Sequence, residues 1–123
     1  MAWRYSQATG ELRYNGAFFE RGYSGKGISP ASGRNNSLLQ GLPDTGPIPV
    51  GWYQIGPAYQ HPHLGPVTMN LTPIGHNALS RTAFRIHGNN QANNASTGCI
   101  ILDLHFRQQI AASSDRTLEV VAW

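Results

Sequence analysis

The stretch from Ile86 to Leu102 contains the residues best suited to covalent catalysis, among them the only cysteine of the chain. Cys99 lies twelve positions after His87. A thiolate attacks a carbonyl carbon far better than a thiol does, and a nearby imidazole can take the thiol proton and so lower the thiol pKa. The two residue types therefore predict Cys99 as a nucleophile and His87 as its base.

The residues around this pair predict how it would be held. Alternating apolar residues indicate a strand that ends near His87 and another that begins after Cys99. Gly88, Gln91 and four asparagines lie between them and indicate a loop. Neighbouring strand ends would then bring the pair face to face. Gly98 would let the backbone bend so that its N–H and that of Cys99 point at a developing oxyanion.

Simpler interpretations of both residues stay open at this point. A lone cysteine is most often a small buried hydrophobe, and a lone histidine is often a core residue. Two other histidines are weaker candidates for the base: His105 would have to fold back from a helix, and His76 lies beyond a strand. His87 is the better candidate because it begins the loop that Cys99 ends.

The motifs around the pair resemble a known family. His87-Gly88, followed by Ser96-Thr97-Gly98-Cys99-Ile100, resembles the signature of L,D-transpeptidase (YkuD-type) catalytic domains. The segment GPIPVGWYQI at 46–55 is similar to that family's Thr-Pro-x-Gly-x-Phe strand start. Two positions depart from the pattern: Thr97 stands where the larger family usually has His, and Ile101 stands where it usually has Arg.

Segments farther from the pair resemble a smaller branch of that family, the type VI secretion L,D-transpeptidase effectors, toxins injected into rival bacteria. These segments are W-x-Y-x-Q-x-TG-x-L at 3–12, GYSG at 22–25 and NN at 35–36. The resemblance covers nearly the whole chain. It implies that both departures are features of this branch rather than a loss of activity.

The resemblance implies a reaction on peptidoglycan. Cys99 would attack the peptide carbonyl of a tetrapeptide stem, and the thioester would be resolved by water or by a D-amino acid, with His87 moving the proton. The Gly98 and Cys99 amides would hold the oxyanion, and the Gly88 carbonyl would orient the imidazole. Three residues are expected to contact the substrate. Ser96 would shape the cleft, and Tyr23 and Asn36 would reach it from the long loop.

Composition narrows the class of protein. The 123 residues are 40% hydrophobic and only 12% charged, with 14 Gly and 8 Pro, which is typical of one turn-rich globular domain and favours β structure. The net charge of +3 comes without a basic run or a nucleic-acid motif, so DNA or RNA binding is not expected. His61 and His63 lack a third ligand at zinc spacing, so neither a metal nor another cofactor is expected.

The N-terminal sequence and the family resemblance together predict where the protein acts and which partners it needs. The start, M-A-W-R-Y-S-Q, has no apolar h-region, and no run is long enough to span a membrane. We expect synthesis in the cytoplasm without a signal peptide and without membrane insertion. A secretion apparatus would then deliver the protein to the periplasm of a target bacterium. A producing strain would need a cognate immunity protein.

The expected fold is mainly β, a single-domain L,D-transpeptidase-like β-sandwich over residues 1–123 with one or two short helices. Two hairpins are expected within 3–20, and further strands at 50–55, 67–73 and 118–123. A long loop at 21–47 would hold one helical turn near 38–40, and 56–66 would be an irregular connection. A helix would run from a cap at Asp103 to about Ser113, and Trp52 would lie in the core.

Two alternatives to an enzyme stay open. One is a non-catalytic cell-wall-binding module that uses Tyr5, Tyr23, Trp52 and Tyr59; the other is a structural part of a secretion apparatus. Retention of the full biological effect by a Cys99→Ala protein would favour the binding module. The order of the pair, with His first, argues against papain-like and NlpC/P60-like cysteine hydrolases.

Overall fold

The computed structural model describes residues 3–123, and its first three strands form an antiparallel meander. These strands are β1 (Trp3–Ser6), β2 (Glu11–Tyr14) and β3 (Ala17–Arg21). Asn15 and Gly16, between β2 and β3, both have positive φ angles, 51° and 85°, as a two-residue type I′ turn requires. The two expected hairpins are confirmed.

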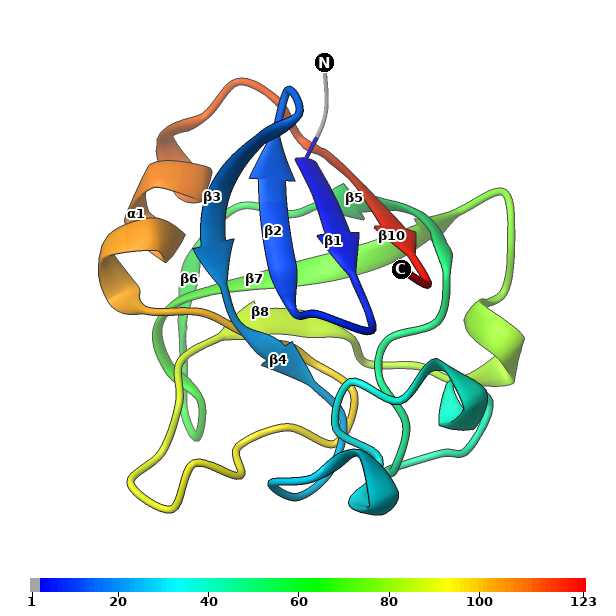
Figure 1. Ribbon diagram of the computed structural model, residues 1–123. Helices are drawn as coiled ribbons and strands as arrows, with labels where there is room; N and C mark the ends of the chain where they lie inside the picture. Colours follow the sequence, from blue (N-terminus) through cyan, green and yellow to red (C-terminus); the bar gives the residue numbers. More distant parts are fainter. Residues whose placement is uncertain (1–2) are drawn as a thin grey trace.

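All the strands belong to one mixed sheet, in which β1 pairs in parallel with β10 and β8 pairs in parallel with β9. The remaining strands are β4 (Tyr23–Ser24), β5 (Gly51–Ile55), β6 (Tyr59–His61), β7 (Gly65–Ile74), β8 (Arg85–His87), β9 (Ile100–Ile101) and β10 (Thr117–Val121). The sheet order is β3-β2-β1-β10-β5-β7-β8-β9-β4, with β6 paired to β7. Gly22 alone joins β3 to β4, the two ends of this order, so the sheet curls back on itself (Figure 1).

The core fills the space between the two halves of the curled sheet. In Figure 1, β5 and β7 cross behind the N-terminal meander. Alternate residues from both halves point inward, and each large apolar side chain buried there contributes about 1.5–3 kcal/mol. The most deeply buried of them are Tyr5, Leu12, Tyr53, Met69, Ile86, Ile100 and Leu118. The expected mainly β, single-domain fold is confirmed.

One α-helix, α1 (Leu104–Ala112), covers an edge of the sheet. It begins after Asp103, as expected, although the Asp103 side chain makes no capping hydrogen bond. Ile110 is buried, and Phe106 meets Phe19 of β3 edge-on at 5.1 Å between ring centroids. No helix among residues 3–123 is both long and apolar enough to cross a membrane.

Three short 3-10 turns complete the chain: η1 (Pro30–Ser32), η2 (Ser37–Leu39) and η3 (Ala78–Ser80). The long loop expected at 21–47 is confirmed from residue 25 onward, since residues 25–50 contain no strand, but its first residues belong to the end of β3 and to β4. η2 lies where a helical turn is expected. Asn36 caps η2, since its side chain accepts a hydrogen bond from the Leu38 N–H. This contact makes Asn36 a structural residue of the loop.

Two expectations were wrong, and both concern this part of the sheet. Residues 56–66 are not an irregular connection, because they contain β6, which forms a hairpin with β7. The strand expected at 67–73 is confirmed as part of β7, in which Pro73 lies opposite Tyr53. Proline fits there if the ladder needs no N–H from that position. Trp52 is 43% exposed and not in the core, because strand alternation turns its neighbour Tyr53 inward instead.

Candidate active site

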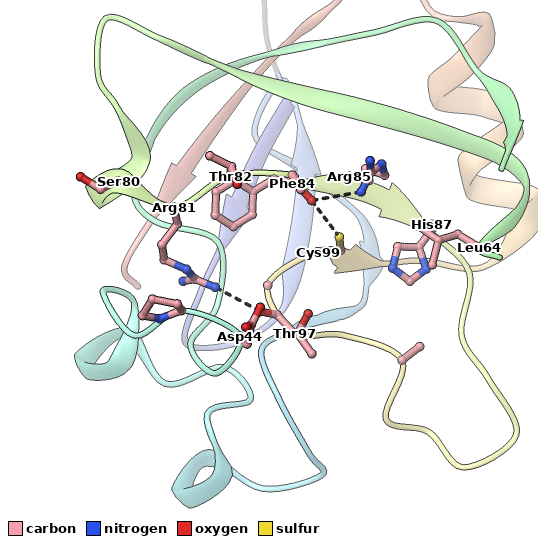
Figure 2. Close-up of a pocket in the computed structure, with 14 residues that line it drawn as sticks. Asp44, Leu64, Ser80, Arg81, Thr82, Phe84, Arg85, His87, Thr97 and Cys99 are labelled. Carbon is pink, nitrogen blue, oxygen red and sulfur yellow. Dashed lines mark hydrogen bonds between the residues drawn. The ribbon is translucent and has the colours of Figure 1, made fainter. Parts of the chain in front are cut away.

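The parallel pairing of β8 with β9 sets the positions of His87 and Cys99. Ile86 pairs with Ile100, so Cys99 lies beside Arg85 and one step diagonally from His87. Side chains alternate along strands, which places Arg85, His87 and Cys99 on the same face. All three line one cavity of about 450 Å³ (Figure 2). The structure therefore brings the predicted pair to one site, through a shared face rather than through two facing strand ends.

His87 is fixed in one tautomer by its neighbour. Its Nδ1 lies 2.9 Å from the Gly88 carbonyl oxygen. A carbonyl only accepts hydrogen bonds, so Nδ1 carries the proton and Nε2 keeps the lone pair that a base needs. Burial lowers the pKa of His87, and the charges of Arg107 and Arg85 lower it further, against the effect of the Gly88 hydrogen bond. The imidazole is therefore neutral at neutral pH.

Cys99 rests as a thiol. Its Sγ donates to the Ala83 carbonyl oxygen at 3.7 Å. Burial raises the pKa of the Cys99 thiol, against the lowering effects of the Arg85 backbone N–H and of the Arg85 and Arg81 charges. The expectation that the imidazole lowers the thiol pKa is thus not met, because loss of hydration outweighs the nearby charges.

Ser96 fixes the turn that precedes the thiol. Its Oγ accepts hydrogen bonds from the Gly25 and Gly98 N–H groups, each at 3.0 Å, and donates to the Cys99 carbonyl at 2.6 Å. The Gly98 N–H therefore donates to Ser96 instead of pointing at an oxyanion, which differs from the expectation. Ser96 itself is 1% exposed and does not line the cavity, so its contacts shape the nucleophile turn instead of the substrate cleft.

Close packing explains why glycine follows His87 and why glycine precedes Cys99. Gly98 has a φ of +146°, and a Cβ there would lie 2.6 Å from Nη2 of Arg81. A Cβ on Gly88 would lie 2.6 Å from Nη2 of Arg107, which is tethered to the Leu102 and Pro66 carbonyls. Both positions have room for backbone alone.

Arg81 joins the long loop to the nucleophile turn. Its guanidinium is buried and donates to the Gln40, Gly46 and Pro47 carbonyls and to the Thr97 carbonyl, at 2.6–3.1 Å. Arg81 thereby fixes one wall of the cavity, to which Pro43 and Asp44 of the long loop also contribute. Figure 2 shows the Arg81 guanidinium directed at the Thr97 turn.

The other two predicted substrate contacts lie away from the cavity. Tyr23 is 3% exposed; its OH donates to Asn89 Oδ1 at 2.6 Å and accepts from the Ala95 N–H at 2.8 Å. Its ring stacks under the guanidinium of Arg34 at 3.5 Å. Tyr23 thus anchors the asparagine-rich loop, and Asn36 caps η2. Neither lines the cavity that contains Cys99.

Three charged residues of the cavity were missed in the sequence, namely Arg85, Arg81 and Asp44. Arg85 could have been found, because it lies two residues before His87 on a strand and so shares its face. Arg81 and Asp44 carry no local signal, since their positions depend on contacts between distant segments.

Among the residues that the structure describes, the other histidines make contacts of their own and form no metal site with the residues of the cavity. No group of three His, Cys, Asp or Glu residues within 3–123 is arranged to hold a metal ion. His61 uses Nδ1 to accept from the His63 and Leu64 N–H groups. His76 contacts the Trp52 carbonyl, and His105 contacts Gln109 on α1.

Comparison with models of known protein families gives a match to the Tlde1 domain over residues 20–122. This range includes every residue that lines the cavity and begins near the end of β3. A comparison with curated proteins gave no match.

Proposed function

We propose that this chain, which belongs to the family of Tlde1 domains found in type VI secretion effectors, is a cysteine-dependent enzyme that modifies peptidoglycan stem peptides. The observation that carries the proposal is the shared cavity of Cys99 and His87, with the imidazole held in the tautomer that a base requires. Sequence motif and geometry support the same pair of residues.

The proposed reaction begins with a proton transfer. His87 Nε2 takes the Cys99 proton as Sγ bonds to the carbonyl carbon that precedes the terminal D-alanine of a tetrapeptide stem. The C–N bond then breaks, and the leaving amine takes the proton from His87. A thioester and free D-alanine result. The positive charges of Arg81 and Arg85 favour the thiolate and the oxyanion in this weakly hydrated site.

The second half of the reaction restores the thiol. Water, or the amine of a D-amino acid, loses a proton to His87 and attacks the thioester carbon. The acyl–sulfur bond breaks, and Sγ takes the proton back. Water gives a tripeptide and a D-amino acid gives an exchanged tetrapeptide. We expect both to exceed cross-linked dimers, because the cavity is bounded by a polar loop that admits small acceptors.

Partners and location follow from the same proposal. The substrate lies in the periplasm of a target bacterium, so the secretion apparatus must deliver the chain there. The producing strain then needs a periplasmic immunity protein that covers the cavity. The alternative of an aromatic wall-binding surface is less well supported, since two of its four residues, Tyr5 and Tyr23, are buried.

Digestion of purified tetrapeptide muropeptides, read by mass with and without an added D-amino acid, tests the activity. The intact protein should release D-alanine and form the exchanged product. Cys99→Ala and His87→Gln should each lower turnover by about 10³-fold or more. An intact protein that leaves the tetrapeptide unchanged would overturn the proposal.

A further inference from the structure

The cavity beside Cys99 is lined by two guanidinium groups whose hydrogen bonding differs. Arg81 is committed to the protein, since both of its terminal nitrogens donate to backbone carbonyls of the loop and the nucleophile turn. A guanidinium whose terminal nitrogens already donate to the protein has few N–H groups left to bind a ligand.

Arg85 has most of its donors unused. Of the five N–H groups of its guanidinium, Nε donates to the Tyr59 OH at 3.2 Å, and Nη1 makes one contact with the Ala83 carbonyl at 3.4 Å. Nη2 makes no hydrogen bond within residues 3–123, and none of the ion pairs there includes Arg85. A cation that lines a cavity without a carboxylate partner can pair with the carboxylate of a ligand.

The position of Arg85 relative to the nucleophile is fixed by two observations. It flanks Cys99 in the register of β8 and β9. Arg85 Nη1 and Cys99 Sγ also both lie within 3.7 Å of the same Ala83 carbonyl oxygen, where the two dashed lines in Figure 2 converge. An anion bound by Arg85 would therefore lie on the same side of the cavity as the thiol.

We propose that Arg85 binds the free α-carboxylate of the terminal residue of the stem peptide and so restricts the enzyme to stems that end in a free acid. This inference rests on the proposed function. The scissile carbonyl and the terminal carboxylate belong to successive residues, whose Cα atoms are about 3.8 Å apart. The unused N–H groups of Arg85 match a carboxylate in a bidentate pair.

Tyr59 holds Arg85 in this position. Its OH accepts from Arg85 Nε and donates to Asn70 Oδ1 at 2.7 Å, so a chain of hydrogen bonds runs from β7 to the guanidinium. Tyr59 is therefore a positioning residue. Tyr59→Phe should raise KM for the free acid with little change in kcat.

The test compares a tetrapeptide with a free C-terminal acid and the same tetrapeptide as its C-terminal amide. The intact protein should prefer the acid roughly 10- to 100-fold in kcat/KM. Arg85→Gln should abolish the preference by slowing turnover of the acid, and Arg85→Lys should restore part of it. Any effect of Arg85 on the thiol pKa acts on both substrates equally and cancels in this ratio. Arg4→Gln removes an exposed arginine outside the cavity and should leave the ratio unchanged.

The outcomes separate this inference from the proposed function. An Arg85→Gln protein that keeps the preference, or an intact protein that turns over both substrates equally, overturns the inference alone. An intact protein that turns over neither substrate overturns the proposed function. Binding to Cys99→Ala then decides the subsite, because equal affinity for acid and amide would overturn it as well.

Discussion

At the scale of single residues, the reactive pair is neutral at rest. Burial raises the pKa of Cys99 and lowers the pKa of His87, so neither carries a charge at neutral pH. Both shifts disfavour a preformed thiolate–imidazolium pair, so in the proposed reaction the proton moves as sulfur attacks. We expect the thiol to react slowly without a substrate whose carbonyl is aligned with it.

The first prediction concerns the pH dependence of thiol alkylation. At neutral pH, iodoacetamide should modify Cys99 more slowly in the folded protein than in the denatured chain, because burial favours the thiol over the thiolate. The rate should rise with pH, with a midpoint above the usual thiol value. Arg85→Gln should move the midpoint higher, since the Arg85 charge lowers this pKa. Mass spectrometry of the labelled protein measures the rate. A folded midpoint at or below the denatured one would contradict the prediction.

The second prediction concerns Gly98. Gly98→Ala and Gly16→Ala both place a side chain on a backbone with positive φ, which costs about 1–2 kcal/mol each. At Gly16 no atom beyond the adjoining residues lies within 4 Å of the new Cβ, whereas at Gly98 the new Cβ meets Arg81 and the Phe84 ring. The loss in unfolding free energy should therefore be clearly larger for Gly98→Ala. Urea denaturation measures both, and equal losses would show that Arg81 can move aside without cost.

At the scale of elements, Arg81 joins the segment that ends the long loop to the turn before Cys99. Its removal should free the Gln40, Gly46, Pro47 and Thr97 carbonyls together. Hydrogen bonds to a charged donor contribute about 1.5–3 kcal/mol each, and unpaired carbonyls that regain water recover part of this. The loop and the cavity wall therefore depend on one side chain.

The third prediction follows from that dependence. Arg81→Gln should lower the unfolding free energy by about 2–4 kcal/mol. Arg4→Gln, which removes an exposed ion pair with Glu119, should lower it by about 0–1 kcal/mol. Amide hydrogen exchange should rise at Gly46 and Lys26, whose N–H groups bond to the Leu42 and Thr45 carbonyls, but not in β10. Unchanged exchange in the loop would exclude Arg81 as its anchor.

Local signals in the sequence predicted the elements that local chemistry determines. Asn15-Gly16 predicted the β2–β3 turn, because only residues that accept positive φ fit there. The helix after Asp103 was found by its spacing. The β6–β7 hairpin was missed, since Pro62 and Pro66 obscure its alternation.

Contacts between distant segments explain what the sequence did not predict about the candidate site. His87 and Cys99 were found by residue type, but Arg81 reaches carbonyls 34–41 residues away, which no pattern indicates. Tyr23 was assigned to substrate because it is a polar residue of the long loop that was expected to contact the substrate. In the fold Tyr23 is buried, its ring lies under the Arg34 guanidinium, and its OH bonds to the asparagine-rich loop.

At the scale of the whole molecule, charge is divided between two surfaces. The ion pairs within residues 3–123 lie on β1, β2, β3 and β10 and use Glu11 and Glu119. The cavity contains Arg81, Arg85 and His87 but only one acidic residue, Asp44. The two guanidinium groups outnumber the one carboxylate of the cavity, and the chain as a whole has a net charge of +3, which would suit an anionic polymer such as the cell wall.

The fourth prediction tests the compartment in which that polymer lies. Fusion of the chain to a periplasmic signal should lower the viability of a bacterium, whereas the same chain in the cytoplasm should not, because the stem peptides of the assembled wall lie outside the inner membrane. Viable counts after induction measure the effect. Arg4→Gln should remain toxic in the periplasm, and Cys99→Ala should not, provided that both accumulate to equal levels. Toxicity that survives Cys99→Ala would favour a wall-binding module over an enzyme, and equal toxicity in both compartments would place the target in the cytoplasm instead.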